Sequence, residues 1–197
     1  MDREFPKLFL YLGDVKFAET WVGGGKIPIN LASSYKSDTR GGVMTPDENL
    51  IYAFARPVEE YQNVIAFSPS VQIHNLTIVG CSVDGRPLSN EYGASRYVED
   101  GLILSFCQTA SYEIMQRLGK VCCVQVIQPD LLLNSIEAQL GPVSKVGPCR
   151  YTSDHRRNHF LKSDEDSWQD EFRFFWKKTD EPTVWVDIPP VAEHLAL

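Results

Sequence analysis

The sequence predicts an α+β protein, with mixed or mainly antiparallel sheets and a few short helices, organised as a single domain over residues 1–197. Three observations support this prediction. The 197 residues, 43% of them hydrophobic and 11% aromatic, suffice to bury roughly 70% of the unfolded surface in one core. Helical segments are scattered among strand-like ones, which separates the chain from a regular βαβ array. No repeat, low-complexity tract or long linker divides the sequence.

The N-terminal part predicts a strand over 7–13, a helix over 14–22 and a second strand over 26–33. The helix follows from the spacing of its apolar residues, and the glycines at 23–25 end it. A polar loop comes next. The segment 45–54 then begins with a threonine N-cap, a proline at the first helical position and two acids, so we expect a short helix there.

The remainder of the chain is richer in strands. Residues 63–69 and 71–85 contain many β-branched residues, and the closing Asp-Gly pair is typical of a hairpin. Strand and helix then alternate twice before three further strand candidates. In order, these segments are 101–107, 110–118, 121–127, 129–140, 144–151, 167–178 and 182–188. We expect Thr109 to cap the helix 110–118, and Cys122 and Cys123 to point to opposite faces of their strand as core residues.

Charge and cysteine usage limit the classes of partner and compartment. With 19 basic and 26 acidic side chains the formal net charge is −7, which argues against duplex nucleic acid as a partner. The sequence contains neither an apolar run of membrane-spanning length nor a signal-peptide pattern at its start. Five cysteines without framework spacing are typical of reduced thiols, so we expect a cytoplasmic protein with no membrane contact.

The segment 167–176 carries the most informative pattern. As a strand with period 2, it would place its aromatic residues on one face, and these are Trp168, Phe172, Phe174 and Trp176. Gln169, Glu171 and Arg173 would then form a polar row on the other face. A rigid strand displaying a carboxylate between an amide and a guanidinium suits a functional site. The alternative is that the row is the solvent side of an amphipathic strand.

Two resemblances give this row a function. Gln169-Asp170-Glu171 resembles the Gln-x-Glu form of the catalytic strand in ADP-ribosyltransferases. A wider pattern is similar to the C-terminal signature of a family of uncharacterised bacterial and phage proteins, and it comprises Tyr151, Phe160, Lys162, Trp168, Glu171 and Arg173. The transferase resemblance implies NAD as cosubstrate. It also implies that Glu171 stabilises the cationic ribose as nicotinamide leaves, and that Gln169 helps to position the acceptor.

The same resemblance extends upstream with less detail. Ser105 lies in a strand that corresponds to the serine-containing central strand of the transferases, where the hydroxyl orients the glutamate. The first strand, 7–13, contains neither the arginine nor the histidine that normally holds NAD. Tyr11 in that strand, Arg40 in the following loop and Arg173 are therefore the candidates for contacts with the cofactor. A half-buried polar residue is the alternative interpretation of Ser105, and a solvated side chain that of Arg40.

Two other chemistries are compatible with parts of the sequence. If 154–159 were helical, His155 and His159 would lie one turn apart, and Cys149 could complete a zinc site, although a polar surface turn explains the same residues. The adjacent basic cluster of His155, Arg156 and Arg157 could contact NAD phosphates or pair with the acids 164–166. We assign no metal from this pattern.

The second of these other chemistries is that of a thiol hydrolase. Cys107 stands before a predicted helix, whose N-terminus would lower the pKa of the thiol. His155 or His159 would serve as the base and Asn158 would orient it. The alternative is an inert buried cysteine.

The sequence therefore leaves two hypotheses about function. The first is an NAD-dependent ADP-ribosyltransferase-like protein, with Glu171, Gln169 and Ser105 as its catalytic residues, that transfers ADP-ribose to an unknown acceptor or hydrolyses NAD. The second is a non-catalytic phage or mobile-element protein that binds and inhibits a host or defence factor. In the first hypothesis the partner is NAD, and the acceptor is a protein side chain, a nucleic acid base or water; in the second, the partner is the host target.

Overall fold

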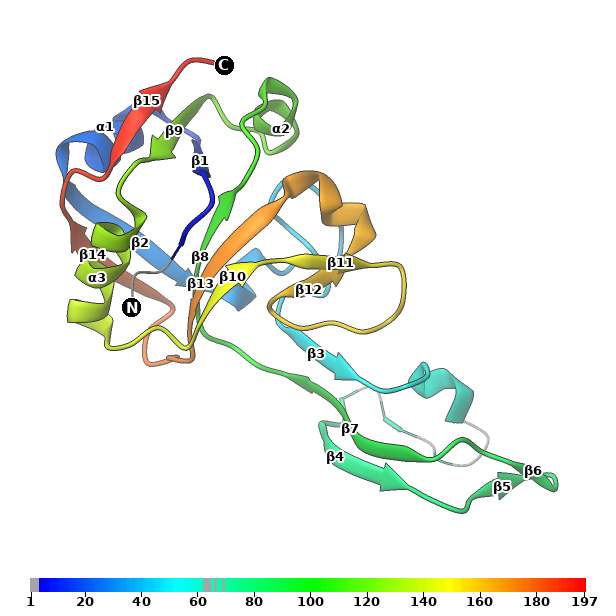
Figure 1. The fold of residues 1–197 in the computed structure, drawn as a ribbon. Helices are drawn as coiled ribbons and strands as arrows, with labels where there is room; N and C mark the ends of the chain where they lie inside the picture. The colour runs from blue at the N-terminus through cyan, green and yellow to red at the C-terminus, as the bar shows by residue number, and fades with distance from the viewer. Residues whose placement is uncertain (1–3, 62–64, 66, 69) are drawn as a thin grey trace.

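Mainly antiparallel strands build the protein, and short helices pack against them, so the predicted α+β class is confirmed (Figure 1). The computed structural model describes residues 4–61, 65, 67, 68 and 70–197. Within these residues, the one parallel pair of named strands joins β11 (Arg150–Thr152) to β12 (Leu161–Ser163). None of the helices in these ranges has the length and hydropathy needed to cross a bilayer.

The principal sheet has the order β10-β13-β8-β1-β9-β15. Its strands are β1 (Leu8–Leu12), β8 (Leu102–Cys107), β9 (Cys122–Val126), β10 (Lys145–Pro148), β13 (Glu171–Trp176) and β15 (Ala192–Leu195). Strand β8 contacts β13 along one side. On its other side it pairs with β1 at Cys107 and with β2 (Gly25–Leu31) at Leu102 and Ile103, and β2 continues to β14 (Thr183–Ile188). The sheet is therefore split between β1 and β2.

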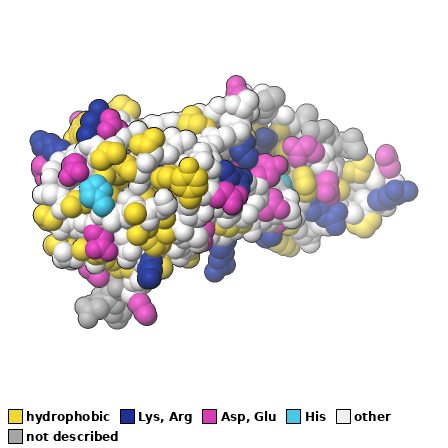
Figure 2. Space-filling model, turned by 90° about the horizontal axis from the view of Figure 1, so that it is seen from above, with side chains coloured by type: hydrophobic (Ala, Val, Ile, Leu, Met, Phe, Trp, Pro, Cys, Tyr) yellow, Lys and Arg dark blue, Asp and Glu magenta, His cyan; other side chains and the backbone are white. Residues whose placement is uncertain are grey.

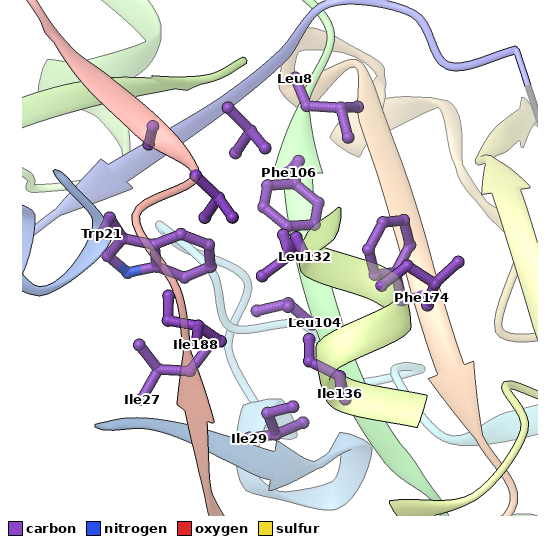
Figure 3. Close-up of a cluster of buried hydrophobic side chains, with 14 of the residues drawn as sticks. Leu8, Trp21, Ile27, Ile29, Leu104, Phe106, Leu132, Ile136, Phe174 and Ile188 are labelled. Carbon is purple, nitrogen blue, oxygen red and sulfur yellow. The ribbon is translucent and has the colours of Figure 1, made fainter. Parts of the chain in front are cut away.

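One face of this sheet forms the main hydrophobic core. Helices α1 (Val15–Gly23) and α3 (Pro129–Leu140) cover it, and both were predicted from their apolar spacing. Figure 3 shows Trp21 of α1 and Leu132 and Ile136 of α3 among the side chains of the strands. Burial of each such side chain contributes roughly 1.5–3 kcal/mol. This face accounts for most of the packing that holds the strands in register.

The opposite face of β1 and β9 packs against α2 (Tyr112–Arg117) in a second cluster. Cys123 belongs to this cluster, whereas Cys122 packs against the main core, so the prediction that they point to opposite faces is confirmed. The predicted cap of α2 is wrong. Ser111, not Thr109, accepts the hydrogen bond from the backbone of Ile114 and starts the helix.

A second sheet projects away from the body (Figure 1). It consists of β3 (Leu50–Ala53), β7 (Glu91–Val98) and β4 (Ile73–Ile78), and a hairpin of β5 (Ser82–Val83) and β6 (Arg86–Pro87) continues it. With η2 (Val58–Tyr61) it encloses its own hydrophobic cluster around Tyr52, Phe54 and Tyr61. The predicted Asp-Gly turn joins β5 to β6. Of the predicted strand 63–69, residues 63, 64, 66 and 69 lie outside the described residues, and the other three form no strand.

The predicted helix at 45–54 is wrong, because this segment forms a turn that leads into β3. Strand β2 ends in a short helix, η1 (Ala32–Tyr35), and a loop then brings Thr45 back beside Lys36. The hydroxyl of Thr45 donates to Asp47, whose carboxylate pairs with Arg40 and Arg157. These ion pairs hold the Asp47 carboxylate in the turn, so it does not stabilise the first turn of a helix as the sequence predicts.

The predicted strand 167–178 is shorter than expected. The helix η3 (Asp164–Gln169) occupies its first part, and Asp170 ends that helix in the left-handed conformation with a φ of 46°. Two hydrogen bonds hold the Asp170 carboxylate, from Thr109 Oγ1 at 2.7 Å and from Gln108 Nε2 at 3.1 Å. Three acids in the first turn, together with the Ser163 cap, favour the helix over an extended segment.

This helix changes the environment of Trp168. Its ring lies under the guanidinium of Arg117 at 3.9 Å and packs against the α2 cluster. The prediction that Trp168 shares the apolar face of the strand is therefore wrong. The prediction holds for Phe172, Phe174 and Trp176, which all lie in the main core.

We predict that Gly101→Ala destabilises the fold by roughly 1–3 kcal/mol. A Cβ atom at Gly101 would lie 2.6 Å from the Phe175 ring and 2.6 Å from the carbonyl oxygen of Trp176, and the latter cannot move without disturbing β13. Gly13→Ala is the matched control, since a Cβ there meets nothing within 4 Å, and it should change stability by less than about 0.5 kcal/mol. Urea denaturation of both variants measures the difference. Equal midpoints would contradict the prediction.

Candidate functional site

A cavity of about 550 Å³ lies where β1 and β2 separate from β8. Strands β1, β2 and β8 line it together with α1, the loop after η1 and the start of β13. The cavity brings together five of the six residues that the sequence singles out, namely Tyr11, Ser105, Gln169, Glu171 and Arg173. They come from four separate elements, so the fold assembles a candidate site that no local segment contains.

Glu171 is the first residue of β13, and its two carboxylate oxygens differ in environment. Oε2 accepts from Lys162 Nζ at 3.1 Å and lies 2.8 Å from Nε and 2.7 Å from Nη2 of Arg173. Across the described part of the chain, Oε1 makes no hydrogen bond or ion pair, and the side chain retains 13% exposure. Burial raises the pKa of Glu171, but Arg173 and Lys162 outweigh this effect and leave it at about 2. The carboxylate is therefore ionised, with one oxygen held and the other open.

Arg173 is buried and already has an oxygen partner at each nitrogen. Besides its contacts with Glu171, Nη1 donates to the carbonyl oxygen of His159 at 2.8 Å. Nη1 and Nη2 also contact Oε1 and Oε2 of Glu48, at 2.8 Å and 3.1 Å. The carboxylates raise the pKa of Arg173 well above its ordinary value despite burial. Arg173 is thus a positioning residue for two carboxylates, which differs from the expected cofactor contact.

Glu48 is a residue of this site that the sequence reasoning missed. Its side chain is 2% exposed, it lines the cavity, and it lies 3.9 Å from Lys162 Nζ. Burial raises the pKa of Glu48, against the opposing effect of Arg173 and Lys162. In the sequence, Glu48 follows Thr45, Pro46 and Asp47, and this local pattern is typical of the first turn of a helix. Its partner Arg173 follows 125 residues later, so no short pattern could identify the pair.

Gln169 and Lys162 connect Glu171 to the loop beside the cavity. Lys162 Nζ donates to Gln169 Oε1 at 2.8 Å, and Gln169 Nε2 donates to the carbonyl oxygen of Gly42 at 2.9 Å. Both ends of the Gln169 amide are therefore occupied. Tyr151 completes the surroundings, since its hydroxyl accepts from the backbone N–H of Glu171 at 2.9 Å. Several residues of the C-terminal signature thus serve to fix Glu171.

Ser105 lies on β8, directly opposite Arg173 in the β8–β13 register. This makes it the diagonal neighbour of Glu171 on the same face, at a separation of roughly 7 Å. Among the described residues its hydroxyl has no hydrogen-bond partner. Lys162 and Arg173, not Ser105, orient Glu171, and the serine hydroxyl remains available to a ligand in the cavity.

Tyr11 and Arg40 contribute less to the cavity than the sequence suggests. The Tyr11 hydroxyl donates to the carbonyl oxygen of Thr109 at 2.9 Å and accepts from the backbone of Ser111 at 2.8 Å. Burial raises the pKa of Tyr11 to about 12, so the phenol is neutral. Because these two hydrogen bonds occupy the hydroxyl, Tyr11 offers the cavity only its ring. Arg40 is absent from the described lining residues. It pairs instead with Asp166 and with Glu165, the latter at 2.7 Å.

The thiol chemistry considered for Cys107 is not supported. Helix α2 begins at Tyr112, so Cys107 is not at a helix N-terminus. Burial raises the pKa of its thiol, and the charge of Glu171 adds to this effect, whereas a nucleophile would need a lowered value.

The geometry proposed for a zinc site is also absent. Residues 153–160 are not helical, and His155 Nε2 contacts the carbonyl oxygen of Phe54 at 3.0 Å, while His159 stacks on Phe175. Within the described ranges, no three His, Cys, Asp or Glu residues lie close enough to hold a metal ion.

The basic cluster at 155–157 is distributed over ion pairs. Arg156 contacts Asp154 at 2.5 Å and Arg157 pairs with Asp47. On the face shown in Figure 2, Lys and Arg side chains lie beside Asp and Glu side chains instead of forming a continuous basic surface. Of the alternatives for this cluster, pairing with acids is the one observed, although the partners are not the acids 164–166.

The chain has no match among protein-family models, curated proteins or solved structures. The chemistry open to the site therefore follows from its own residues. An ionised carboxylate with one free oxygen, a free serine hydroxyl and a second buried carboxylate meet in a cavity of ligand size. Such an arrangement can stabilise a developing positive charge and exchange a proton.

We predict that Arg173→Met destabilises the protein by about 3–5 kcal/mol, because it leaves Glu48 and Glu171 as buried carboxylates without their main partner. Arg56→Met removes an exposed ion pair with Glu60 and should cost less than about 0.5 kcal/mol. Chemical denaturation at pH 7 measures both. Similar losses in the two variants would show that the buried network does not contribute as described.

We predict that His159→Phe makes the protein more resistant to acid. The imidazole is 5% exposed, and neither ring nitrogen has a hydrogen-bond partner among the described residues. Burial lowers the pKa of His159 from 6.5 to about 4. The unfolded chain therefore binds a proton that the native state does not, and stability falls as the pH drops from 6.5 towards 4, by about 2 kcal/mol at pH 5.

In His159→Phe, the phenyl ring should keep the stacking on Phe175, whose ring centroid lies 4.1 Å from that of the imidazole. Because phenylalanine does not titrate, the fall in stability between pH 6.5 and pH 4 should disappear. Unfolding free energies of both proteins at pH 7 and pH 5 test it. If the variant loses as much stability as the wild type over this interval, His159 is not the titrating group.

Proposed function

We propose that this protein is an ADP-ribosyltransferase-like enzyme that binds NAD in the cavity beside Glu171 and cleaves the bond between ribose and nicotinamide. The observation that carries the proposal is the state of Glu171: ionised, held through Oε2, and with Oε1 free at a cavity. A fixed negative charge stabilises the oxocarbenium-like transition state more than the ground state. The resemblance of Gln169-Asp170-Glu171 to the transferase catalytic strand supports the same chemistry.

The neighbouring residues then have distinct tasks. Ser105 binds the ligand through its free hydroxyl, and the Tyr11 ring forms an apolar wall. Lys162 and Arg173 position Glu171. Gln169, which the resemblance links to the acceptor, also ties Glu171 to the loop at Gly42, so it acts on the acceptor through the shape of that loop.

The mouth of the cavity suits a phosphorylated ligand. Lys26, Lys120 and Trp185 line it. Lys26 is exposed, Trp185 is 61% exposed, and Lys120 is half-buried. An exposed indole can stack on a base, and an ammonium group can pair with a phosphate. Lys26 stands opposite Asp187 in the β2–β14 pair, so Lys120 is the better candidate for the phosphate contact.

The cytoplasm is the compartment we propose. All five cysteines are free thiols in the structure. Cys107, Cys123 and Cys149 are buried, and reduced thiols of this kind are typical of a reducing compartment.

A non-catalytic binding protein is the second candidate, and the projecting sheet favours it. This sheet has its own hydrophobic cluster and carries the exposed side chain of Tyr92. Exposed aromatic residues are frequent in protein interfaces. In this case the protein would inhibit a host or defence factor, as expected for a phage or mobile-element protein, and the cavity would have no turnover.

We predict that NAD binds at millimolar concentration or better and that nicotinamide is released. Glu171→Gln should lower turnover by about 100- to 1,000-fold, because the fixed charge is lost, and leave most of the NAD affinity intact. Calorimetry measures binding, and chromatography measures nicotinamide. Glu60→Gln, at an exposed ion pair far from the cavity lining, is the matched control and should behave as the wild type.

Two outcomes would count against this proposal in different ways. Absence of NAD binding at millimolar concentration would overturn the transferase-like function and leave the binding protein. Normal turnover by a folded Glu171→Gln variant would remove Glu171 from the mechanism. Thermal unfolding of each variant establishes that it is folded.

A further inference from the structure

A single residue joins the two elements that carry Gln169 and Glu171. Helix η3 ends at Gln169 and strand β13 begins at Glu171, so only Asp170 lies between them. Asp170 has a φ of 46° and a ψ of 54°, the left-handed conformation that residues other than glycine rarely adopt. Strained residues of this kind gather at functional sites, where the surrounding structure holds them in place.

Hydrogen bonds hold Asp170 from two sides. The backbone N–H of Gln108 donates to the carbonyl oxygen of Asp170 at 2.8 Å. The side chains of Gln108 and Thr109 donate to its carboxylate, at 3.1 Å and 2.7 Å. On the other side, the N–H of Asp170 donates to the carbonyl oxygen of Ser167 at 3.2 Å. The segment that follows β8 is therefore bonded directly to the residue that joins η3 to β13.

The two neighbours of Asp170 meet at one cation. Lys162 Nζ lies 2.8 Å from Gln169 Oε1 and 3.1 Å from Glu171 Oε2. In an extended segment, Asp170 would share the face of Phe172, which lies in the main core, and its carboxylate would be buried there without hydrogen-bond donors. Because a helix precedes it, the conformation of Asp170 sets how Gln169 and Glu171 are directed relative to each other.

We propose that Asp170 is a positioning residue of the site, which fixes the orientation of Glu171 through its hydrogen bonds with the end of β8. Asp170 is not among the described residues that line the cavity, so it acts through Glu171 and not on the ligand. Strand β8 also carries Ser105, so the same bonds link the two strands that present the serine hydroxyl and the carboxylate. The kinetic test of this inference rests on the proposed function, and its spectroscopic test does not.

The need for accurate placement follows from the task proposed for Glu171. A charge stabilises a transition state only when it lies close to the charge that develops, and a misplacement of about 1 Å can lower turnover by about 100-fold. Lys162 and Arg173 hold Oε2 of Glu171, while Asp170 sets the direction in which the chain enters β13. A change in that direction moves the carboxylate relative to a bound ligand.

Substitutions at Asp170 test the assignment. Asp170→Ala removes the hydrogen bonds of the carboxylate, and it should lower kcat for nicotinamide release by about 10- to 100-fold while KM for NAD changes by less than about threefold. Asp170→Asn keeps the shape, an oxygen acceptor and the tendency to adopt the left-handed conformation, so it should lose less than about threefold in kcat. Asp84→Ala is the matched control, because Asp84 has a φ of 48° in the exposed turn between β5 and β6 and should leave kcat unchanged.

A second variant leaves Asp170 itself in place. Thr109→Val removes the hydroxyl that donates to the Asp170 carboxylate, and Thr109 is exposed, so this variant should fold whether or not Asp170→Ala does. Loss of this one hydrogen bond should lower kcat by about three- to tenfold.

The position of Glu171 can be followed without NAD. Arg173 Nε–H donates to Glu171 Oε2 at 2.8 Å, so its resonance in ¹H–¹⁵N spectra reports where the carboxylate lies. The resonance should shift in Asp170→Ala and in Thr109→Val, and it should stay in place in Asp170→Asn and Asp84→Ala.

The outcomes separate this inference from the proposed function. Wild-type kcat or an unshifted Arg173 resonance in Asp170→Ala and Thr109→Val would overturn the positioning role, and so would an equal loss of kcat in Asp170→Asn and Asp170→Ala. Absence of nicotinamide release from the wild type would instead overturn the proposed function, and the Arg173 resonance would still decide whether Asp170 positions Glu171.

Discussion

The pairing of Arg173 with Glu48 and Glu171 is the interaction on which the rest of the site depends. With Lys162 it forms a group of two cations and two anions whose formal charges cancel, and none of the four side chains is more than 13% exposed. Removing such groups from water costs several kcal/mol for each ion unless the partners are well placed. The partners come from the loop before β3, from β12 and from β13, so the network holds these three segments to one another.

Alternation along β13 and β8 separates this network from the hydrophobic core. Phe172 and Phe174 face the helices, while Glu171 and Arg173 face the cavity, and the register sets Arg173 opposite Ser105. A shift of one residue would exchange the two faces and bury the charges against α3. The large aromatic side chains on the core face make that shift costly. Packing on one side of the strand therefore fixes the geometry of the polar groups on the other, and the split between β1 and β2 leaves room for a ligand beside them.

The sequence predicted the elements whose signals are local. Helices α1 and α3 and strands β1, β8 and β9 follow from spacing, caps and glycine stops, and the structure contains them. Gln169, Glu171 and Arg173 do gather, but not as one strand face, since Gln169 reaches the site from η3. Glu48 was missed, because Asp47 and Glu48 look like a helix start when their partners Arg157 and Arg173 are unknown. Ion pairs between residues more than 100 positions apart override the local preference of this segment for a helix. The spacing of residues along the sequence does not predict such pairs.

Because Glu48 and Arg173 lie 125 residues apart, their ion pair can form only late in the synthesis of the chain. Contacts that close long loops form late, after the local helices and hairpins, because ordering the intervening chain costs entropy. A growing chain that ends before β13 has the cavity walls of β1, β2 and β8 but neither Glu171 nor the guanidinium that orients it. A nascent chain that has not reached β13, or a chain shortened before it, therefore lacks the charged groups of the site, so the topology itself delays activity until β13 has been synthesised.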